Sequence, residues 1–189
     1  NQGFHISETD IIEGIKKARI EGRLEVIQED PLILLDGAHN AAGARALGAF
    51  LEDLDPDTLE NESNTSTLEK GSSTKHTGKH WLISGIMRDK QISEMMSPLL
   101  NWTDEFVLTH PDIERAADAS HIAKITESLL NQQPNHRPLI TLKPKVSDAV
   151  SYVKSQMNPQ DVLVITGSFY TVGEARGALT GATPSLIRG

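Results

Sequence analysis

Residues 32–40 read Leu-Ile-Leu-Leu-Asp-Gly-Ala-His-Asn, four aliphatic residues followed at once by a polar run. The aliphatic part predicts a buried strand, and the alanine-rich stretch 41–51 predicts a helix directly after it. Asp36, His39 and Asn40 therefore stand where a strand passes into a helix. Ligands of open α/β sheets bind at the carboxyl ends of the strands, so this junction is the first candidate for a functional site.

The pattern on both sides of this junction predicts an α/β domain. Strands alternate with helices toward the end of the chain, which indicates βαβ units and a mostly parallel sheet. The first two strands are separated only by the turn 29–31, so we expect them to pair antiparallel, because a parallel pair needs a long crossover. The predicted strands are 23–28, 32–36, 81–86, 105–109, 139–142 and 161–166, and the predicted helices are 7–19, 40–54, 91–100, 119–131, 147–157 and 169–179.

Composition narrows the class of protein. A length of 189 residues fits one domain, and the absence of cysteine excludes a disulfide scaffold, a thiolate metal site and a cysteine nucleophile. The net charge of −8, without a cluster of basic residues, argues against broad nucleic-acid binding. No apolar run approaches the roughly 18 residues that span a bilayer, and the first residues lack a signal-peptide pattern. We therefore expect a soluble cytoplasmic protein without a membrane partner.

A long polar tract interrupts the alternation. Residues 55–79 are rich in Asn, Ser, Thr and Glu and contain little that could pack. We expect a mobile surface insertion here and not a domain boundary, because the elements on each side are too few to fold alone. The expected organisation is a helix and linker at 1–20 followed by one domain, 21–189, that carries the insertion.

Polar residues also follow the other predicted strands, at 85–90, 109–115 and 166–168. Parallel strands share one carboxyl edge, so we expect these residues to gather near Asp36. Each alone is more often an ordinary cap or turn residue, and it is their concentration at one edge that favours a site. Glycine there allows a ligand close to the backbone, and a helix beginning near Ser168 offers N–H groups to a phosphate or carboxylate.

The common complete motifs are absent from the chain. It has no P-loop, no Gly-x-Gly-x-x-Gly after a strand and no Gly-x-Ser-x-Gly elbow. The histidines show no metal-ligand spacing: His76 and His80 are four residues apart, but they lie in or beside the polar tract, where a helix is not expected. We assign no metal ligand to this chain.

Four motifs, in order along the chain, carry a resemblance to a known family. Residues 23–26, 34–40, 84–90 and 166–174 resemble the C-terminal domain of folylpolyglutamate synthase and of the related dihydrofolate synthase, members of the Mur ligase superfamily. The matches extend from about residue 23 to residue 176. The resemblance implies a three-layer, Rossmann-like fold with a mostly parallel sheet of about six strands and an antiparallel strand at its N-terminal side.

The resemblance also implies an activity. Such ligases use ATP to convert a folate carboxylate to an acyl phosphate, which the amine of L-glutamate then attacks. The P-loop and the magnesium ligands belong to a separate N-terminal ATPase domain, and the C-terminal domain closes over the nucleotide. The implied partners are that ATPase domain, L-glutamate and folate, in a monomeric enzyme. The chain would then be a fragment without turnover on its own.

The same resemblance assigns roles to five residues. By position, Arg23, Asp36 and Asn40 match residues of the nucleotide side, His39 matches a motif residue close to the reaction centre, and Ser168 lies near the amino-acid site. Their chemistry agrees with these roles. The planar fork of an arginine suits phosphate oxygens, a carboxylate accepts two hydrogen bonds as from a ribose diol, and an imidazole can stabilise charge on a transferred phosphoryl group.

Two departures from the family pattern surround these residues. Ala41 stands where the family usually has proline after His-Asn, and Ile20-Glu21 stand where it usually has Trp-Pro before Gly-Arg. The ligase interpretation requires the Arg23 guanidinium, the Asp36 carboxylate and the His39 imidazole to open onto one rim that faces the nucleotide-holding partner domain. Two alternatives stay open at this point: a stand-alone ligand-binding module of receiver or flavodoxin type, and an interaction domain without catalysis.

Overall fold

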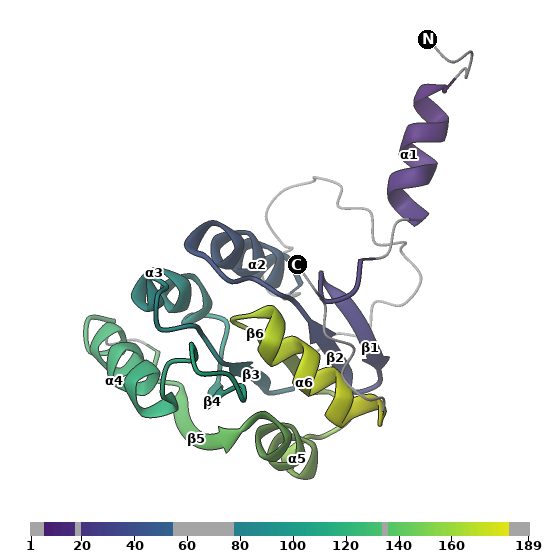
Figure 1. The fold of residues 1–189 in the computed structure, drawn as a ribbon. Coiled ribbons are helices and arrows are strands. Elements are labelled where there is room, and N and C mark those ends of the chain that lie inside the picture. The colour runs from purple at the N-terminus through teal and green to yellow at the C-terminus, as the bar shows by residue number, and fades with distance from the viewer. Residues whose placement is uncertain (1–5, 18–19, 55–77, 134–135, 182–189) are drawn as a thin grey trace.

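The computed structural model describes residues 6–17, 20–54, 78–133 and 136–181, and it has the predicted α/β architecture (Figure 1). The sheet has six strands in the order β1-β2-β6-β3-β4-β5. The strands are β1 (Glu25–Glu29), β2 (Leu32–Leu35), β3 (His80–Ser84), β4 (Glu105–His110), β5 (Leu139–Lys145) and β6 (Val162–Thr166). The pair β1–β2 is antiparallel and all other pairs are parallel, which confirms the predicted sheet.

Helices cover both faces of the sheet and form the outer layers (Figure 1). The helices are α1 (Glu8–Lys17), α2 (Ala41–Leu54), α3 (Ile92–Met96), α4 (Ala119–Leu130), α5 (Val146–Gln156) and α6 (Phe169–Thr180). Alternate residues of a strand point to opposite faces. Leu34 therefore packs in the core beneath α2, α3 and α4, whereas Ile33 and Leu35 pack in the core beneath α5 and α6.

Several boundaries differ from the predicted ones, and three of the differences have a clear physical cause. The first strand begins at Glu25 and not at residue 23, because the turn before it includes Leu24 at a positive φ of 42°. The predicted helix 91–100 divides into α3 and a 3₁₀ turn at 97–99, since Pro98 has no N–H for a continuing α-helix. Strand β5 extends three residues further, to Lys145, and includes Pro144, which an edge strand tolerates.

The N-terminal helix stands away from the sheet (Figure 1). Ser7 caps it as expected: the Ser7 hydroxyl accepts a hydrogen bond from the Asp10 N–H at 3.1 Å, and the Asp10 carboxylate accepts one from the Ser7 N–H at 2.9 Å. Most of the predicted insertion, residues 55–77, lies outside the described residues. Within the described part of the chain, no helix is both long enough and apolar enough to cross a membrane.

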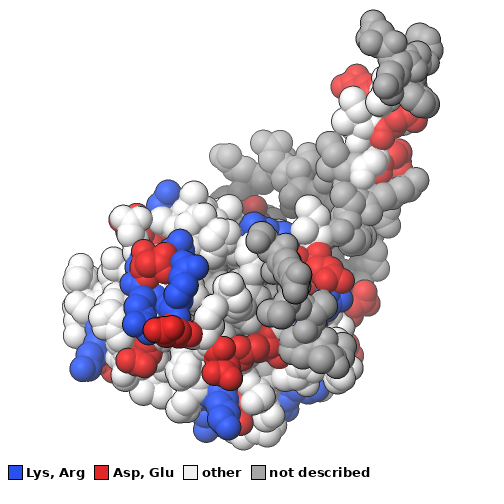
Figure 2. Space-filling view, viewed as in Figure 1, with Lys and Arg blue, Asp and Glu red and all other residues white. Residues whose placement is uncertain are grey.

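Charged side chains of both signs are intermixed on the face shown in Figure 2. A group of ion pairs joins two of the predicted loops, 85–90 and 109–115. Arg115 pairs with Asp89 at 3.2 Å, and Lys90 pairs with the same carboxylate at 3.2 Å. Hydrogen bonds from both cations lower the pKa of Asp89 below its ordinary value. The negative charge of Asp89 is therefore compensated by the positive charges of Lys90 and Arg115.

Candidate functional site

Hydrogen bonds connect the turn after β2 to the turn before β1. The Asp36 carboxylate accepts hydrogen bonds from the Leu24 N–H at 3.0 Å and from the Ala38 N–H at 2.9 Å. The Gly37 N–H donates to the Gly22 carbonyl at 2.6 Å. Only 7% of Asp36 is exposed, so its carboxylate lies behind the turn that carries Arg23. Asp36 is thus a brace for that turn, in addition to its predicted role toward a nucleotide.

Arg23 and His39 meet at one aromatic ring. The Arg23 guanidinium carbon lies 4.7 Å from the centre of the Phe169 ring, and the centre of the His39 ring lies 5.3 Å from it at a tilt of 42°. Arg23 is exposed and His39 is half-buried. Arg23 and His39 are therefore brought together at one ring, whereas the Asp36 carboxylate does not open onto the rim, because it is buried and bonded to the backbone N–H groups of the two turns.

The His39 ring has a defined orientation. Its Nδ1 lies 2.9 Å from the Gly37 carbonyl oxygen. A carbonyl only accepts, so Nδ1 carries the proton in this contact, and Nε2 is the nitrogen left to face a ligand. The turn that places Asp36 beneath Arg23 therefore also orients the imidazole.

Asn40 and Ser168 begin helices. The Asn40 side-chain oxygen accepts from the Gly43 N–H at 2.8 Å, at the start of α2. The Ser168 hydroxyl accepts from the Thr171 N–H at 3.1 Å and lies 2.8 Å from the Thr171 hydroxyl, and only 2% of Ser168 is exposed. Both are helix caps in this structure, the ordinary role that the sequence pattern also predicts for single polar residues at strand ends. Their roles toward ligands remain predictions.

Removal of the Ser168 cap gives a testable expectation. We expect Ser168→Ala to lower the free energy of unfolding by about 1 kcal/mol, the usual cost of a lost N-cap. Urea denaturation followed by circular dichroism measures this. The matched control is Ser155→Ala, an exposed hydroxyl in the last turn of α5, which we expect to change stability by less than about 0.5 kcal/mol. Equal effects of the two substitutions would contradict the capping role.

Two glycines at this edge accommodate neighbouring protein atoms. Gly167 has a φ of +101°, and a Cβ there would lie 2.7 Å from the Gly85 carbonyl oxygen. A Cβ on Gly85 would lie 2.5 Å from the Thr171 hydroxyl oxygen. The sequence interpretation took such glycines as room for a ligand. In the structure this room is taken by the adjoining strand end and the first turn of α6.

Sequence reasoning missed an ionic link from α6 to the Arg23 turn. Arg176 pairs with Glu21 at 2.7 Å and with Glu25 at 3.2 Å, and the other oxygen of Glu25 accepts from the Gly22 N–H at 2.7 Å. The hydrogen bond and charge of Arg176 lower the pKa of Glu21. These residues lie about 150 positions apart in the chain, so no local pattern could have paired them.

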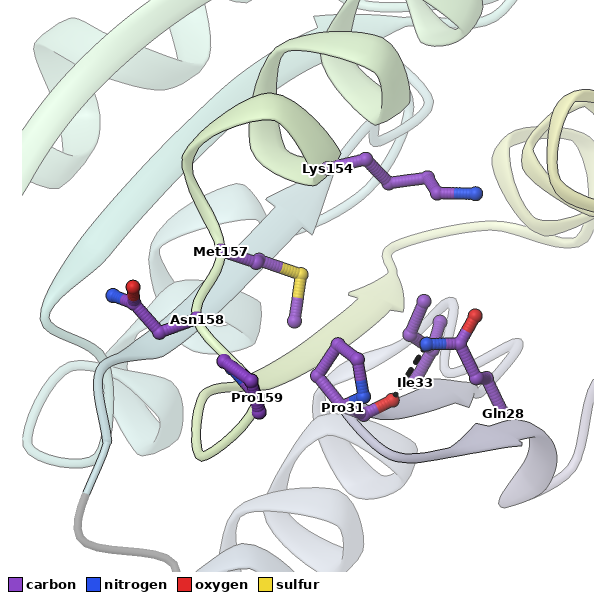
Figure 3. A pocket seen from close by; sticks show the side chains of 7 residues that line it. All are labelled: Gln28, Pro31, Ile33, Lys154, Met157, Asn158 and Pro159. Atoms are coloured by element: carbon purple, nitrogen blue, oxygen red, sulfur yellow. Dashed lines mark hydrogen bonds between the residues drawn. The ribbon is translucent and has the colours of Figure 1, made fainter.

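The candidate site is an open rim. The cavity drawn in Figure 3, of about 190 Å³, lies at the opposite edge, where β2 and β6 begin. Its lining residues are Gln28, Pro31, Ile33, Lys154, Met157, Asn158 and Pro159. No group of three or more His, Cys, Asp or Glu side chains among the described residues could hold a metal ion. The rim offers the exposed Arg23 guanidinium and the His39 imidazole, a pair suited to anionic groups.

The fold is that of a C-terminal domain of the Mur ligase type, and comparison with known proteins identifies the branch. The family model described as dihydrofolate synthetase, C-terminal domain, matches residues 22–177. The chain belongs to this family. The assignment favours the ligase interpretation over a receiver or flavodoxin module.

Relatives and solved structures agree with this assignment. The chain is 30% identical over 177 residues to the dihydrofolate synthase/folylpolyglutamate synthase of Buchnera aphidicola subsp. Baizongia pistaciae, covering 92% of the chain and 34% of that protein. The Bacillus subtilis protein of the same name is 25% identical over 175 residues, covering 93% and 34%. The chain thus spans about a third of the length of these relatives.

Among solved structures, the Yersinia pestis bifunctional folylpolyglutamate synthase/dihydrofolate synthase complexed with AMPPNP and Mn ion matches with a TM-score of 0.70 and 25% identity. The match covers 94% of this chain and 35% of that one. The Mycobacterium tuberculosis folylpolyglutamate synthase complexed with ADP matches in fold, with a TM-score of 0.68, 24% identity and coverage of 95% and 36%.

Proposed function

We propose that this chain is the C-terminal domain of an ATP-dependent ligase that adds L-glutamate to folate, as a folylpolyglutamate synthase that can also act as a dihydrofolate synthase. One observation carries the proposal: Arg23 and His39 share the Phe169 ring while Asp36 braces the Arg23 turn. Three motifs of the family thus converge on one rim. The family match over residues 22–177 supplies the reaction class.

In the proposed reaction the γ-phosphoryl group of ATP passes to a folate carboxylate oxygen, which yields ADP and an acyl phosphate. The amine of glutamate then attacks the acyl carbon, loses a proton and expels phosphate. Arg23 contacts phosphate oxygens with its fork, and His39 stabilises charge on the transferred group. Asp36 and Asn40 contribute to the nucleotide side, and Ser168 lies toward the glutamate site.

The remaining parts of the site come from a partner domain in this proposal. ATP needs a P-loop and magnesium ligands, and we place both on an N-terminal ATPase domain of the same monomeric, cytoplasmic enzyme. Residues 1–20 are the linker to it, and 21–189 are the domain that closes over the nucleotide. This arrangement accounts for an open rim where Arg23 is exposed. The chain alone is then expected to bind ATP weakly and to lack turnover.

Reconstitution tests the proposal. Mixed with the N-terminal ATPase region of the same enzyme, the chain is expected to support glutamate-dependent ADP release. Arg23→Ala and His39→Ala are expected to lower that rate at least about tenfold, because each removes a group that acts on the transferred phosphoryl. Coupled measurement of ADP follows the rate.

The matched controls are Arg137→Ala and His121→Ala, exposed residues away from the rim, which should leave the rate unchanged. Circular dichroism spectra that match wild type show that each variant is folded. The ligase proposal would be contradicted if the chain and the N-terminal region are both folded but release no ADP. It would also be contradicted if neither Arg23→Ala nor His39→Ala changes the rate.

A further inference from the structure

Phe169, the first residue of α6, contacts both of the turns that build the rim, the turn before β1 and the turn after β2. Its ring lies 4.7 Å from the Arg23 guanidinium carbon and 5.3 Å from the centre of the His39 ring. It also lies directly against the backbone of Gly37. No role was predicted for Phe169 from the sequence, and its side chain carries no group that reacts with a phosphate or a carboxylate.

The glycines of the two turns make room for this ring. A Cβ on Gly37 would lie 2.4 Å from the Phe169 Cε1 atom and 2.6 Å from Cδ1, distances that no real side chain tolerates. A Cβ on Gly22 would lie 3.7 Å from Phe169 Cδ1 and 3.2 Å from Val172 Cγ1. The ring therefore rests on bare backbone, and Gly37 cannot be replaced without displacing it.

The position of Phe169 is itself fixed. Ser168 precedes it and caps the helix through the Thr171 N–H, and the Thr171 hydroxyl donates to the Gly85 carbonyl at 2.8 Å. Hydrogen bonds on the side of α6 toward β3 thus hold the first turn to the sheet. Tyr170, the next residue, is 45% exposed. Phe169 is half-buried, so the two neighbouring aromatic residues differ in exposure, and Tyr170 can serve as a control for substitutions of Phe169.

An aromatic partner suits a phosphate-binding arginine. The face of a phenyl ring attracts a guanidinium without taking its N–H donors, whereas a carboxylate would occupy those donors and cancel the charge. Among the described residues, no carboxylate forms an ion pair with Arg23. Within the described residues, the ring thus contacts Arg23 while no carboxylate occupies its N–H donors, which are then available to an anion.

We propose that Phe169 is a positioning residue, a platform whose ring sets the Arg23 guanidinium and the His39 imidazole relative to each other. The proposal rests on the function proposed above, since it assigns the platform to the ATP side of that reaction. Phe169 acts through Arg23 and His39 and does not itself contact the reacting atoms. It is expected to affect the KM for ATP more than the KM for glutamate.

Three variants of the 189-residue chain test the platform. Phe169→Leu keeps apolar bulk and removes the ring, Phe169→Tyr keeps the ring, and Tyr170→Leu removes the exposed neighbouring ring. NMR measures the Arg23 side-chain protons, which the ring current of Phe169 shifts upfield. We expect Phe169→Leu to abolish that shift, and Phe169→Tyr and Tyr170→Leu to retain it. Thermal unfolding of each variant shows that the fold is kept.

Kinetics of the reconstituted enzyme complete the test. Phe169→Leu is expected to raise the KM for ATP about fivefold with little change in the KM for glutamate, and Phe169→Tyr to restore it. An Arg23 signal unchanged in Phe169→Leu, or an active enzyme whose KM for ATP is the same as wild type, would overturn the platform. If the Arg23 signals respond as expected but wild-type protein releases no ADP, the positioning of Arg23 stands and the ligase proposal fails.

Discussion

Replacing Glu105 by alanine is expected to lower the free energy of unfolding by about 2–3 kcal/mol. Glu105 begins β4 and is 3% exposed. Its carboxylate accepts hydrogen bonds from Lys79 Nζ at 2.6 Å, the Thr141 hydroxyl at 2.7 Å and the Tyr152 hydroxyl at 3.1 Å. Alanine would leave the Lys79 ammonium, whose side chain is 34% exposed, and two hydroxyls without their acceptor. The unsatisfied hydrogen-bonding groups carry the cost.

Urea denaturation with linear extrapolation measures this loss. Glu127→Ala removes an exposed carboxylate from α4 and is expected to change stability by less than about 0.5 kcal/mol. Glu105 lies at the edge of the sheet opposite the rim, so the Arg23 and His39 signals should remain as in wild type. A loss no greater than that of Glu127→Ala would show that these contacts do not stabilise the domain.

The same carboxylate makes stability depend on pH. Burial raises the pKa of Glu105, but the hydrogen bond and charge of Lys79, with the hydrogen bonds of Thr141 and Tyr152, outweigh burial and lower the pKa below its ordinary 4.5. The folded form thus takes up this proton less readily than the unfolded chain. The stabilisation is present above the unfolded pKa and is lost as pH falls through the folded pKa.

A neutral variant isolates that contribution. Glu105→Gln retains an oxygen acceptor and cannot titrate, so it is expected to be less stable than wild type at neutral pH. The difference should shrink as the pH falls below about 4.5, because wild type then loses its charged carboxylate. Unfolding curves at neutral and acid pH measure the difference. A constant difference across the range would contradict a charge effect.

Local patterns were sufficient to predict most of the fold. Strand β2 follows from four adjacent aliphatic residues, and β6 follows from the continuous apolar run 162–165, because strands buried on both faces lose the alternation of polar residues. The antiparallel start follows from the short turn. The order of the strands in the sheet could not be predicted in this way. Strand β6 lies between β2 and β3, and no local sequence pattern specifies those neighbours.

The site was predictable only in part. The motifs placed Arg23, Asp36 and His39 near one edge; Arg23 and His39 meet at Phe169, whereas the Asp36 carboxylate lies buried behind the Arg23 turn. Gly37 packs so closely against the Phe169 ring that a Cβ there would clash with it. The two positions are 132 residues apart in the chain, so this contact exists only in the folded domain. The bracing role of Asp36 is equally invisible in sequence, since it depends on where the Leu24 N–H lies.

Asp36→Ala is expected to lower the free energy of unfolding by about 2–4 kcal/mol and to release the Arg23 turn. The substitution deprives the Leu24 and Ala38 N–H groups of their acceptor at a position that is 7% exposed. Leu24 has a positive φ of 42°, which a leucine adopts only when the surroundings hold it there. Urea denaturation measures the loss, and Asp53→Ala, an exposed carboxylate on α2, is the control.

Asp36→Asn separates the two roles of this carboxylate. The amide keeps one oxygen for the Ala38 N–H but turns a donor toward the Leu24 N–H, so we expect a smaller loss of stability and a partial loss of the Arg23 ring-current shift. If bracing is its whole function, the KM for ATP should rise only as far as the Arg23 shift is lost. A variant that retains the shift but still binds ATP poorly would show that Asp36 also contacts the nucleotide, as its motif predicts. An Arg23 signal unchanged in Asp36→Ala would contradict the brace.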